Sequence, residues 1–319
     1  MTNDLFQHIE EAHRAIRPQV SVTPLAFSPM LSKATGCEVY LKCEHLQHTG
    51  SFKFRGATNK LRLLDADARR NGVLTVSSGN HGQGVALAGK LAGVPVTVYA
   101  STSAAAIKLD AIRALGAEVI TLNDTTLAVE LEAARQAKLK GMAFVSPYND
   151  LDVIAGQGTI GMELHEQASD LAAVFASVGG GGLISGIGTA VKTLSPKTDV
   201  IGCWPANSTA LYSSLKAGKI IDVEETETIS DGTAGGVEPG SVTFDIAREI
   251  ITGTSLVTEE EIKAAMKLLA QTDRWMVEGA AGVALASMLQ LSHQYQGGAV
   301  AVVLCGRNIM LNKFIEAVK

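Results

Sequence analysis

The chain lacks the features that mark membrane, secreted or nucleic-acid-binding proteins. No apolar run approaches the roughly 20 residues that a membrane span needs. Aromatic residues make up only 5% of the 319 residues, no basic cluster occurs, and the net charge is -5. This balance gives no support for binding to nucleic acid or to a membrane surface. The first ten residues also lack a signal peptide's basic start and apolar core. We expect a cytoplasmic globular protein.

Cysteine is equally scarce and shows no framework spacing. The cysteines at positions 37, 43, 203 and 305 are therefore interpreted as reduced thiols. Cys43, His45 and His48 lie close together, but their spacing fits no usual zinc motif and no second cluster completes a site. We interpret them as strand-end and loop residues and predict no metal site. The remaining histidines outside the segments discussed below are expected on helix surfaces, namely His8, His13, His165 and His293.

Glycine, in contrast, is abundant at 32 residues, and it is clustered. From about residue 70, short β-branched runs alternate with longer helical patterns. This alternation predicts an α/β fold with parallel sheets and right-handed crossovers, while residues 204–255 are less regular. The predicted strands are 72–76, 94–99, 118–122, 143–145, 171–178, 199–204 and 299–304, and the predicted helices are 82–91, 104–115, 125–140, 183–194, 259–272 (with Thr258 as N-cap) and 279–291.

A lysine lies between two aromatic residues in the segment Thr49–Ala57. Phe52 and Phe54 flank Lys53, and desolvation by such neighbours disfavours the ammonium form. A neutral lysine is a nucleophile suited to imine chemistry. For an isolated lysine, a solvated helix start would be the simpler interpretation, so the hypothesis depends on the two segments that follow.

The segment Ser77–Gly84 (SSGNHGQG) directly follows a predicted strand and opens a predicted helix. Open α/β sheets bind ligands at this end of their strands. Hydroxyls, an amide and free N–H groups at a helix N-terminus suit a carboxylate. A tight turn with a serine helix cap accounts for the serines alone, but poorly for the whole run.

Four consecutive glycines, Gly179 to Gly182, lie between another predicted strand and helix. Converging N–H groups at a helix N-terminus form an anion cradle, most naturally for phosphate. No lysine follows in the Walker pattern, which disfavours nucleotide triphosphates. Glycines also permit close helix packing, but four in a row exceed that expected need.

The string Gly156–Gly161 (GQGTIG) matches the dinucleotide-binding fingerprint. It follows residues 150–155, which are typical of a helix start rather than a strand, and the position about 20 residues further on is Ala176 rather than an acid. We therefore reject a Rossmann cofactor site here.

A reactive lysine, a carboxylate-binding turn and a phosphate cradle together favour pyridoxal 5′-phosphate. The chain also resembles, over almost its whole length, the serine/threonine dehydratase and serine racemase group of the β-family (fold type II) of pyridoxal-phosphate enzymes. The resemblance implies two parallel-sheet α/β domains of tryptophan-synthase-β-like architecture, a large one of residues 1–69 and 149–319 and a small mobile one of residues 70–148. It is carried by Lys42–Glu44, Gly50–Ala57, Ser77–Gln83, Ile154–Thr159, Gly179–Gly182, Asp231–Ala234 and Cys305–Asn308.

The resemblance also implies roles for single residues. Lys53 would bond to the cofactor aldehyde and take the Cα proton. Ser78 matches the opposite-face acid/base of serine racemases, where many threonine dehydratases carry alanine. A homodimer is implied as well. The cofactor would be bound by Phe52, Lys53, Asn80, Gly179, Gly180, Gly181, Gly182 and Cys305, and the substrate by Ser77, Ser78, Gly79, Asn80 and His81.

Three departures from the family pattern stand out. Cys305 replaces the serine or threonine that usually faces the pyridine nitrogen of the cofactor. A protonated thiol is a weak and uncharged hydrogen-bond partner, so we expect the ring nitrogen to stay neutral. A neutral ring nitrogen fits β-elimination. Trp204 and Ala210 stand where the racemase-like branch has cation-binding acids, so that metal site is predicted to be absent. The expected serine pair is replaced near Gly235-Gly236, which alters the substrate-carboxylate side.

The expected activity is therefore that of a dehydratase/ammonia-lyase: water is eliminated from a β-hydroxy amino acid, and the released aminoacrylate is hydrolysed to a 2-oxo acid and ammonia. Candidate substrates are threonine, serine, 3-hydroxyaspartate or a hydroxylated diamino acid such as those of hydroxyectoine breakdown. The alternatives are an amino-acid racemase that uses Lys53 and Ser78, and a non-catalytic ligand-binding protein on the same scaffold. The retained Lys53 disfavours the last.

Overall fold

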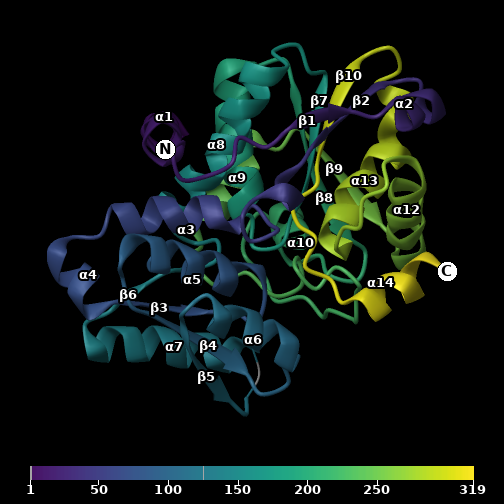
Figure 1. Cartoon of the computed structure of the whole chain (residues 1–319). Helices are drawn as coiled ribbons and strands as arrows, with labels where there is room; N and C mark the ends of the chain where they lie inside the picture. Colours follow the sequence, from purple (N-terminus) through teal and green to yellow (C-terminus); the bar gives the residue numbers. More distant parts are fainter. Residues whose placement is uncertain (1, 125) are drawn as a thin grey trace.

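The computed structural model describes residues 2–124 and 126–319. Two residues therefore lie outside the described part: Met1, the first residue of the expected segment 1–69, and Thr125, the first residue of the predicted helix 125–140. Two separate sheets organise the described residues (Figure 1). The larger has six strands in the order β1-β2-β10-β7-β8-β9, and only the β1–β2 edge pair is antiparallel. Its strands are β1 (Leu25–Phe27), β2 (Glu38–Lys42), β7 (Ala173–Ser177), β8 (Asp199–Pro205), β9 (Gly253–Val257) and β10 (Ala299–Val303).

The smaller sheet has four parallel strands in the order β5-β4-β3-β6. All four residues of β3 are buried, which explains its continuous run of apolar and β-branched residues. The predicted strands and helices of this region are confirmed to within two residues at each described end. Its elements are β3 (Val73–Val76), α5 (Asn80–Ala92), β4 (Val96–Ser101), α6 (Ala106–Ala114), β5 (Glu118–Leu122), α7 (Thr126–Lys140) and β6 (Ala143–Phe144).

Most of the remaining helices surround the larger sheet, whereas α3 and α4 lie on the side of the smaller sheet (Figure 1). The predicted cap of α12 is confirmed: Thr258 Oγ1 accepts from Glu261 N at 3.2 Å, and the Glu261 carboxylate accepts from Thr258 N at 2.7 Å. These helices are α1 (Thr2–Ile16), α2 (Pro29–Thr35), η1 (Glu44–Leu46), α3 (Lys53–Arg62), α4 (Ala66–Asn71), α8 (Leu151–Gln167), α9 (Gly182–Leu194), α10 (Ala210–Ala217), α11 (Val242–Ile250), α12 (Glu259–Thr272), α13 (Gly279–Leu291), η2 (Ser292–Gln294) and α14 (Leu311–Val318).

Helix α8 contains the rejected dinucleotide fingerprint, and its glycines serve helix packing. A Cβ on Gly156 would lie 2.6 Å from the Cα of Gly56 in α3. On another side of α8, a Cβ on Gly186 of α9 would lie 2.5 Å from the Gly158 nitrogen. Helix α8 therefore holds α3, which begins at Lys53, and α9, which follows the glycine tetrad, at backbone-to-backbone distance.

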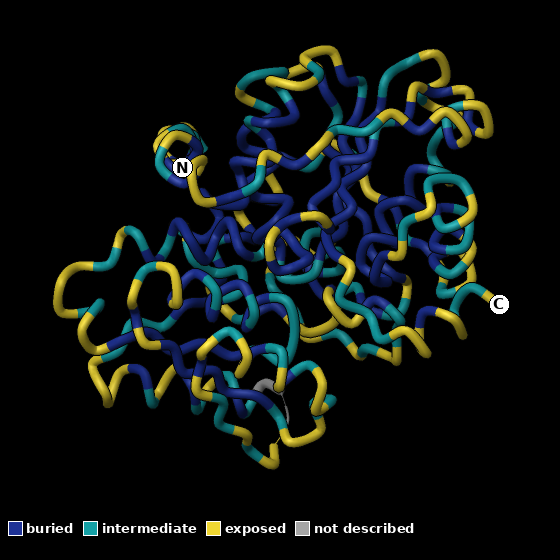
Figure 2. The backbone as a smooth tube through the Cα atoms, viewed as in Figure 1, coloured by how far each residue is buried: buried dark blue, intermediate teal, exposed yellow. Residues whose placement is uncertain are grey.

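The larger sheet and the smaller sheet each have their own hydrophobic core, and Figure 2 shows buried backbone running through both regions. The four cysteines are free and buried. The expectation that His13 lies on a helix surface is wrong: His13 is 9% exposed and bonds Glu166 at 2.8 Å, because it faces α8 rather than solvent. No described helix is long and apolar enough to cross a membrane.

Candidate active site

Lys53 begins α3 and is partly buried at the junction of the two sheets. Its Nζ donates to the Pro147 carbonyl at 2.8 Å and lies 5.2 Å from the centre of the buried Phe52 ring. Burial lowers the Lys53 pKa to about 8, although the nearby Cys305 and Glu278 oppose that shift. Phe54, the other flanking aromatic, is fully buried in the core under the smaller sheet.

The serine-rich turn lies where the sequence predicts it, at the carboxyl end of β3. Ser77 Oγ accepts from Gly79 N at 3.0 Å, and Ser78 is half-buried beside it. His81 is buried, and its Nε2 donates to the Val145 carbonyl at 3.1 Å. Burial, together with the positive charge of Lys53, lowers the His81 pKa to about 3. His81 is therefore a neutral imidazole in this site.

Asn80 takes part in a polar network that spans the two sheets. Its Nδ2 donates to both carboxylate oxygens of Glu278, at 2.8 and 3.0 Å. Its Oδ1 accepts from Asn308 Nδ2 at 2.6 Å, and the Asn308 backbone N–H donates to Glu278 at 3.1 Å. The side chain that the family resemblance assigns to the cofactor ring is thus held in place from both sides.

Glu278 is the functional candidate that the sequence reasoning missed. Burial raises its pKa to about 7, with a further raising effect from the charge of Asp231, while the hydrogen bond from Asn80 opposes the shift. Perturbed carboxyls of this kind cluster at functional sites. The only local signal was an acid directly before the small-residue helix α13, which is also typical of an ordinary helix N-terminus.

Cys305 follows β10 and is buried next to Lys53 and Glu278. Its Sγ lies 3.6 Å from Ser177 Oγ and 4.0 Å from a Glu278 oxygen. Burial raises the Cys305 pKa well above its usual value, and the Glu278 charge adds to this effect. The thiol is therefore protonated and uncharged near neutral pH.

The glycine tetrad connects β7 to α9. Gly181 has a φ of +91°, a left-handed conformation that favours glycine. A Cβ on Gly180 would lie 2.4 Å from the Tyr148 ring, and one on Gly179 would lie 2.9 Å from the Thr233 carbonyl. The expectation that four glycines exceed any packing need is therefore wrong: close neighbours limit several of these positions. The unpaired N–H groups of the first helical turn remain available to an anion.

Tyr148 is a second residue that sequence reasoning missed. It follows Pro147, which accepts the Lys53 hydrogen bond, and its ring lies against Gly180. Its hydroxyl accepts from the Glu238 backbone N–H at 3.1 Å. The segment Pro147-Tyr148 therefore contacts both Lys53, through the Pro147 carbonyl, and the glycine tetrad, through the Tyr148 ring.

The other residues singled out in the sequence lie outside this cluster or at its edge. Trp204 is buried in the large core with its ring 5.5 Å from that of Tyr212. Gly235, with a φ of +122°, is exposed, and its N–H donates to Glu225 at 2.8 Å. Cys43 is buried, with its Sγ donating to the Leu41 carbonyl.

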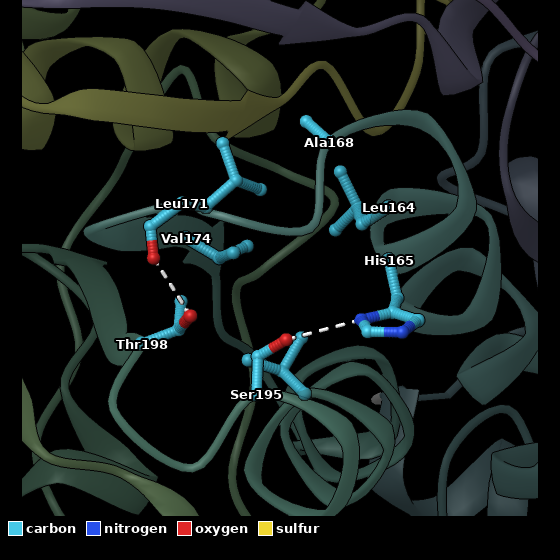
Figure 3. A pocket seen from close by; sticks show the side chains of 8 residues that line it. Leu164, His165, Ala168, Leu171, Val174, Ser195 and Thr198 are labelled. Carbon is cyan, nitrogen blue, oxygen red and sulfur yellow. Dashed lines mark hydrogen bonds between the residues drawn. The ribbon is translucent and has the colours of Figure 1, made fainter.

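Two cavities differ in character. The cavity in Figure 3 holds only about 10 Å³, the lower limit for a single water molecule, and His165 bonds Ser195 at its edge. A more open groove of about 440 Å³ lies beside the site, between Lys108 of α6 and Asn308. Neither contains the Lys53 amine.

The geometry defines a class of protein: a two-sheet α/β enzyme scaffold with a desolvated lysine, a polar turn and a glycine cradle at one junction. The family model described as pyridoxal-phosphate dependent enzyme matches residues 16–306. The chain belongs to this family, and its cofactor is pyridoxal 5′-phosphate.

Similar proteins cover most of the chain. The L-threonine ammonia-lyase of Thermotoga maritima is 42% identical over 308 residues, which cover 96% of this chain and 76% of the relative. The L-threo-3-hydroxyaspartate ammonia-lyase of a Pseudomonas species is 37% identical, with 93% of each chain covered. The processed threonine deaminase isoform 2 of Solanum lycopersicum superposes with a TM-score of 0.94 at 33% identity, covering 99% of this chain and 93% of that one. Serine racemase from Dictyostelium discoideum gives 0.88 at 37% identity, covering 96% and 98%.

The residues present fit the cofactor. Lys53 supplies an amine whose pKa is lowered from 10.5 to about 8, so that roughly a tenth of it is neutral at pH 7. Gly181 turns the chain at the start of the 13-residue helix α9, where the helix dipole would stabilise a phosphate. The uncharged thiol of Cys305 is compatible with a neutral pyridine nitrogen.

Proposed function

We propose that this chain is an ammonia-lyase that eliminates water from a β-hydroxy amino acid. The released enamine takes up water again on hydrolysis, so the net products are a 2-oxo acid and ammonia. The observation that carries the proposal is the partly buried Lys53, with its lowered pKa, beside the serine-asparagine turn, in a chain about 40% identical to proteins named L-threonine ammonia-lyase. Candidate substrates are threonine, serine, 3-hydroxyaspartate and a hydroxylated diamino acid. Because Gly235 and Gly236 are exposed, we keep the larger hydroxylated amino acids among the candidate substrates.

The proposed roles follow from the positions of the side chains. Lys53 would hold the cofactor aldehyde, Gly179–Gly182 its phosphate, and Phe52, Asn80 and Cys305 its ring. Pyridoxal phosphate supplies an electron sink that makes the substrate Cα proton acidic. The Lys53 amine removes that proton, which its lowered pKa favours at neutral pH.

The turn after β3 serves the substrate in this proposal. Ser77, Ser78, Gly79, Asn80 and His81 line it, and the N-terminus of α5 favours a carboxylate there. The neutral His81 neither repels Lys53 nor competes for its proton. The Ser78 hydroxyl is available to protonate the departing β-hydroxyl.

The test is a substrate panel. The purified, cofactor-loaded protein is incubated with L-threonine, L-serine, L-threo-3-hydroxyaspartate and 3-hydroxy-2,4-diaminobutyrate, and 2-oxo acid and ammonia are measured together. Lys53→Ala serves as the control for catalysis, and Lys60→Ala, on the same helix, as the control for substitution. We expect equal amounts of the two products from at least one substrate; no product from any of them overturns the proposal.

A second candidate activity is racemisation of an amino acid by Lys53 and Ser78 on opposite faces. The specific observation in its favour is that Ser78, rather than alanine, stands half-buried in the turn next to Asn80. Two of the similar solved structures are described as serine racemases, from Dictyostelium discoideum and from maize. Elimination and racemisation share the removal of the Cα proton, so one site can support both.

We further propose that residues 70–148 form a small domain that closes over the larger one, that the chain forms a homodimer, and that it acts in the cytoplasm. Lys108 of α6 and Asp231 form an ion pair at 2.6 Å between the proposed small domain and the larger one, which would stabilise a closed form.

The four free cysteines fit the proposed location in a reducing compartment. Sedimentation of the loaded protein tests the dimer, and a single species at monomer mass overturns that part.

A further inference from the structure

A buried ionic cluster is attached to helix α3 through Arg55, two residues after Lys53, the lysine proposed to react. It consists of two cations, Lys42 and Arg55, and two anions, Glu44 and Glu163, so its formal charges balance. The side chains are 0–2% exposed. We call these four residues the Arg55 cluster. Charged groups this deep are retained only when each is paired and hydrogen-bonded.

Arg55 connects the members of the cluster. Its Nε and Nη2 donate to the two oxygens of Glu44 at 2.8 and 2.9 Å. Its Nη1 and Nη2 donate to the two oxygens of Glu163 at 2.7 and 2.9 Å. Thr159 Oγ1 and the Ser21 carbonyl accept further bonds at 3.1 and 3.2 Å. The planar guanidinium is thus fixed in position and in orientation by two bidentate partners.

The two carboxylates that bind Arg55 belong to the region built around the larger sheet. Glu44 lies in η1, directly after β2, and Glu163 lies in α8. Lys42, the last residue of β2, donates to Glu163 at 2.6 Å and to Gln167 at 2.9 Å, which ties β2 to α8. Burial alone would lower the Arg55 pKa, but Glu44 and Glu163 outweigh it and raise that pKa, so Arg55 stays charged.

Arg55 lies in the same helical turn as Lys53, but its side chain points to another side of the helix. The two residues are two positions apart at the start of α3, and about 100° per residue separates their directions by about 200°. Lys53 points to the Pro147 carbonyl, whereas Arg55 points to η1 and α8. The first turn of α3 is therefore bonded on both sides, and a shift of the guanidinium would move the lysine.

We propose that Arg55 is a positioning residue for Lys53, and that its two-sided carboxylate contact sets the place of the Lys53 amine relative to the cofactor cradle. This inference rests on the proposed role of Lys53 as the residue that holds the cofactor aldehyde. An ion cluster with a purely structural role would stabilise the fold without distinguishing covalent from noncovalent binding of the cofactor. That difference can be measured.

The experiment compares two probes on the same apo-protein. Pyridoxal 5′-phosphate binds through its phosphate and also covalently to a lysine, whereas 4-deoxypyridoxine 5′-phosphate has no aldehyde and binds through the cradle alone. Arg55→Lys keeps the charge but loses the bidentate geometry. Arg62→Lys, at the other end of the same helix, is the matched control, because Arg62 bonds Asn59 and the exposed Glu11.

For Arg55→Lys we expect pyridoxal 5′-phosphate affinity to fall on the order of tenfold or more, since small misplacements of a reacting group are costly, with little change for the deoxy probe. Arg62→Lys should change neither affinity. Equal losses for both probes, or no loss for either, overturn the inference. If Arg55→Lys does not fold in a thermal unfolding assay, Glu44→Gln, which keeps the shape and removes one charge, is measured against the same criteria.

The failure of the proposed function gives a different result. If Lys53→Ala still attaches pyridoxal 5′-phosphate covalently, as borohydride reduction and mass spectrometry would show, then Lys53 is not the aldehyde-binding residue. The probe comparison on Arg55→Lys, in contrast, tests only whether this arginine places the lysine.

Discussion

Lys53 Nζ donates a 2.8 Å hydrogen bond to the backbone carbonyl of Pro147. This bond joins the first turn of α3 to the segment that leads from β6 of the smaller sheet into α8. The lysine proposed to react is therefore bonded to the residue before Tyr148, whose ring packs against Gly180 of the glycine tetrad. Its amine must leave the Pro147 carbonyl to act on another group, and a neutral amine leaves it more easily than an ammonium.

The first prediction concerns the pH dependence of this amine. Burial lowers the Lys53 pKa to about 8, so the reactive neutral form increases as pH rises through that value. The rate at which pyridoxal 5′-phosphate attaches to the apo-protein should therefore increase from pH 6 to pH 9 with a midpoint about 8. Stopped-flow absorbance measures this rate. Lys53→Ala should show no attachment, and a midpoint near the ordinary lysine pKa of 10.5 would contradict the prediction.

The second prediction concerns Glu278 and the stability of the apo-protein. Its pKa is raised from 4.5 to about 7 in the folded state, so between these values the folded chain binds more protons than the unfolded chain. The free energy of unfolding should consequently decrease as pH rises from about 4.5 to 7, and the contribution should stay lost above pH 7.

Glu278→Gln removes the titrating group and should flatten this decrease in urea unfolding curves between pH 5 and pH 7.5. The exposed Glu260→Gln is the matched control and should keep the wild-type slope. The same decrease in the Glu278 variant and in wild type would show that another group causes it.

The third prediction separates elimination from racemisation at Ser78. Ser78→Ala removes the Ser78 hydroxyl, whereas Lys53 can still take the Cα proton. Racemisation of recovered substrate should fall on the order of 100-fold or more, as for loss of a general acid or base, whereas 2-oxo acid formation should fall less. Chiral chromatography of recovered substrate gives the first value and a coupled ketoacid assay the second.

Ser77→Ala is the control for this experiment, because the Ser77 hydroxyl accepts from Gly79 N and supports the turn itself. Racemisation that persists in Ser78→Ala would remove Ser78 from the proposed mechanism.

The fold was predictable where the chain alternates buried strands with helices. Predicted helix 279–291 and predicted strand 118–122 match α13 and β5. Short elements with weak sequence patterns were not predicted. Strand β1, for example, has only three residues, 25–27, and pairs antiparallel at the edge of the larger sheet. Its position depends on contact with β2, which no local period in the sequence encodes.

Site residues were predictable only where a local segment carries its own chemistry. The glycine tetrad and the turn after β3 are continuous segments, so their residue types could be interpreted directly. Glu278 could not be found, because its partners Asn80 and Asn308 lie 198 and 30 positions away. The Arg55 cluster is similar: Arg55 and Glu163 are 108 residues apart, and only folding reveals that they share a buried site.

The fourth prediction concerns the contact between Gly180 and Tyr148. A Cβ on Gly180 would lie 2.4 Å from Tyr148 Cγ, much closer than van der Waals contact. Gly180→Ala should therefore destabilise the apo-protein by about 1–3 kcal/mol, the usual cost of overpacking. It should also weaken binding of 4-deoxypyridoxine 5′-phosphate, because the displaced ring or the displaced loop disturbs the cradle.

A double-mutant cycle identifies the ring as the cause. In a Tyr148→Ala background the ring is absent, so adding Gly180→Ala should cost little further stability, and the coupling energy should approach the whole cost of the single Gly180 substitution. Gly236→Ala, at an exposed glycine with nothing within 4 Å of its Cβ, should cost little in either background. Additive costs for Gly180→Ala and Tyr148→Ala would mean that the backbone of the tetrad, rather than the Tyr148 ring, requires glycine at position 180.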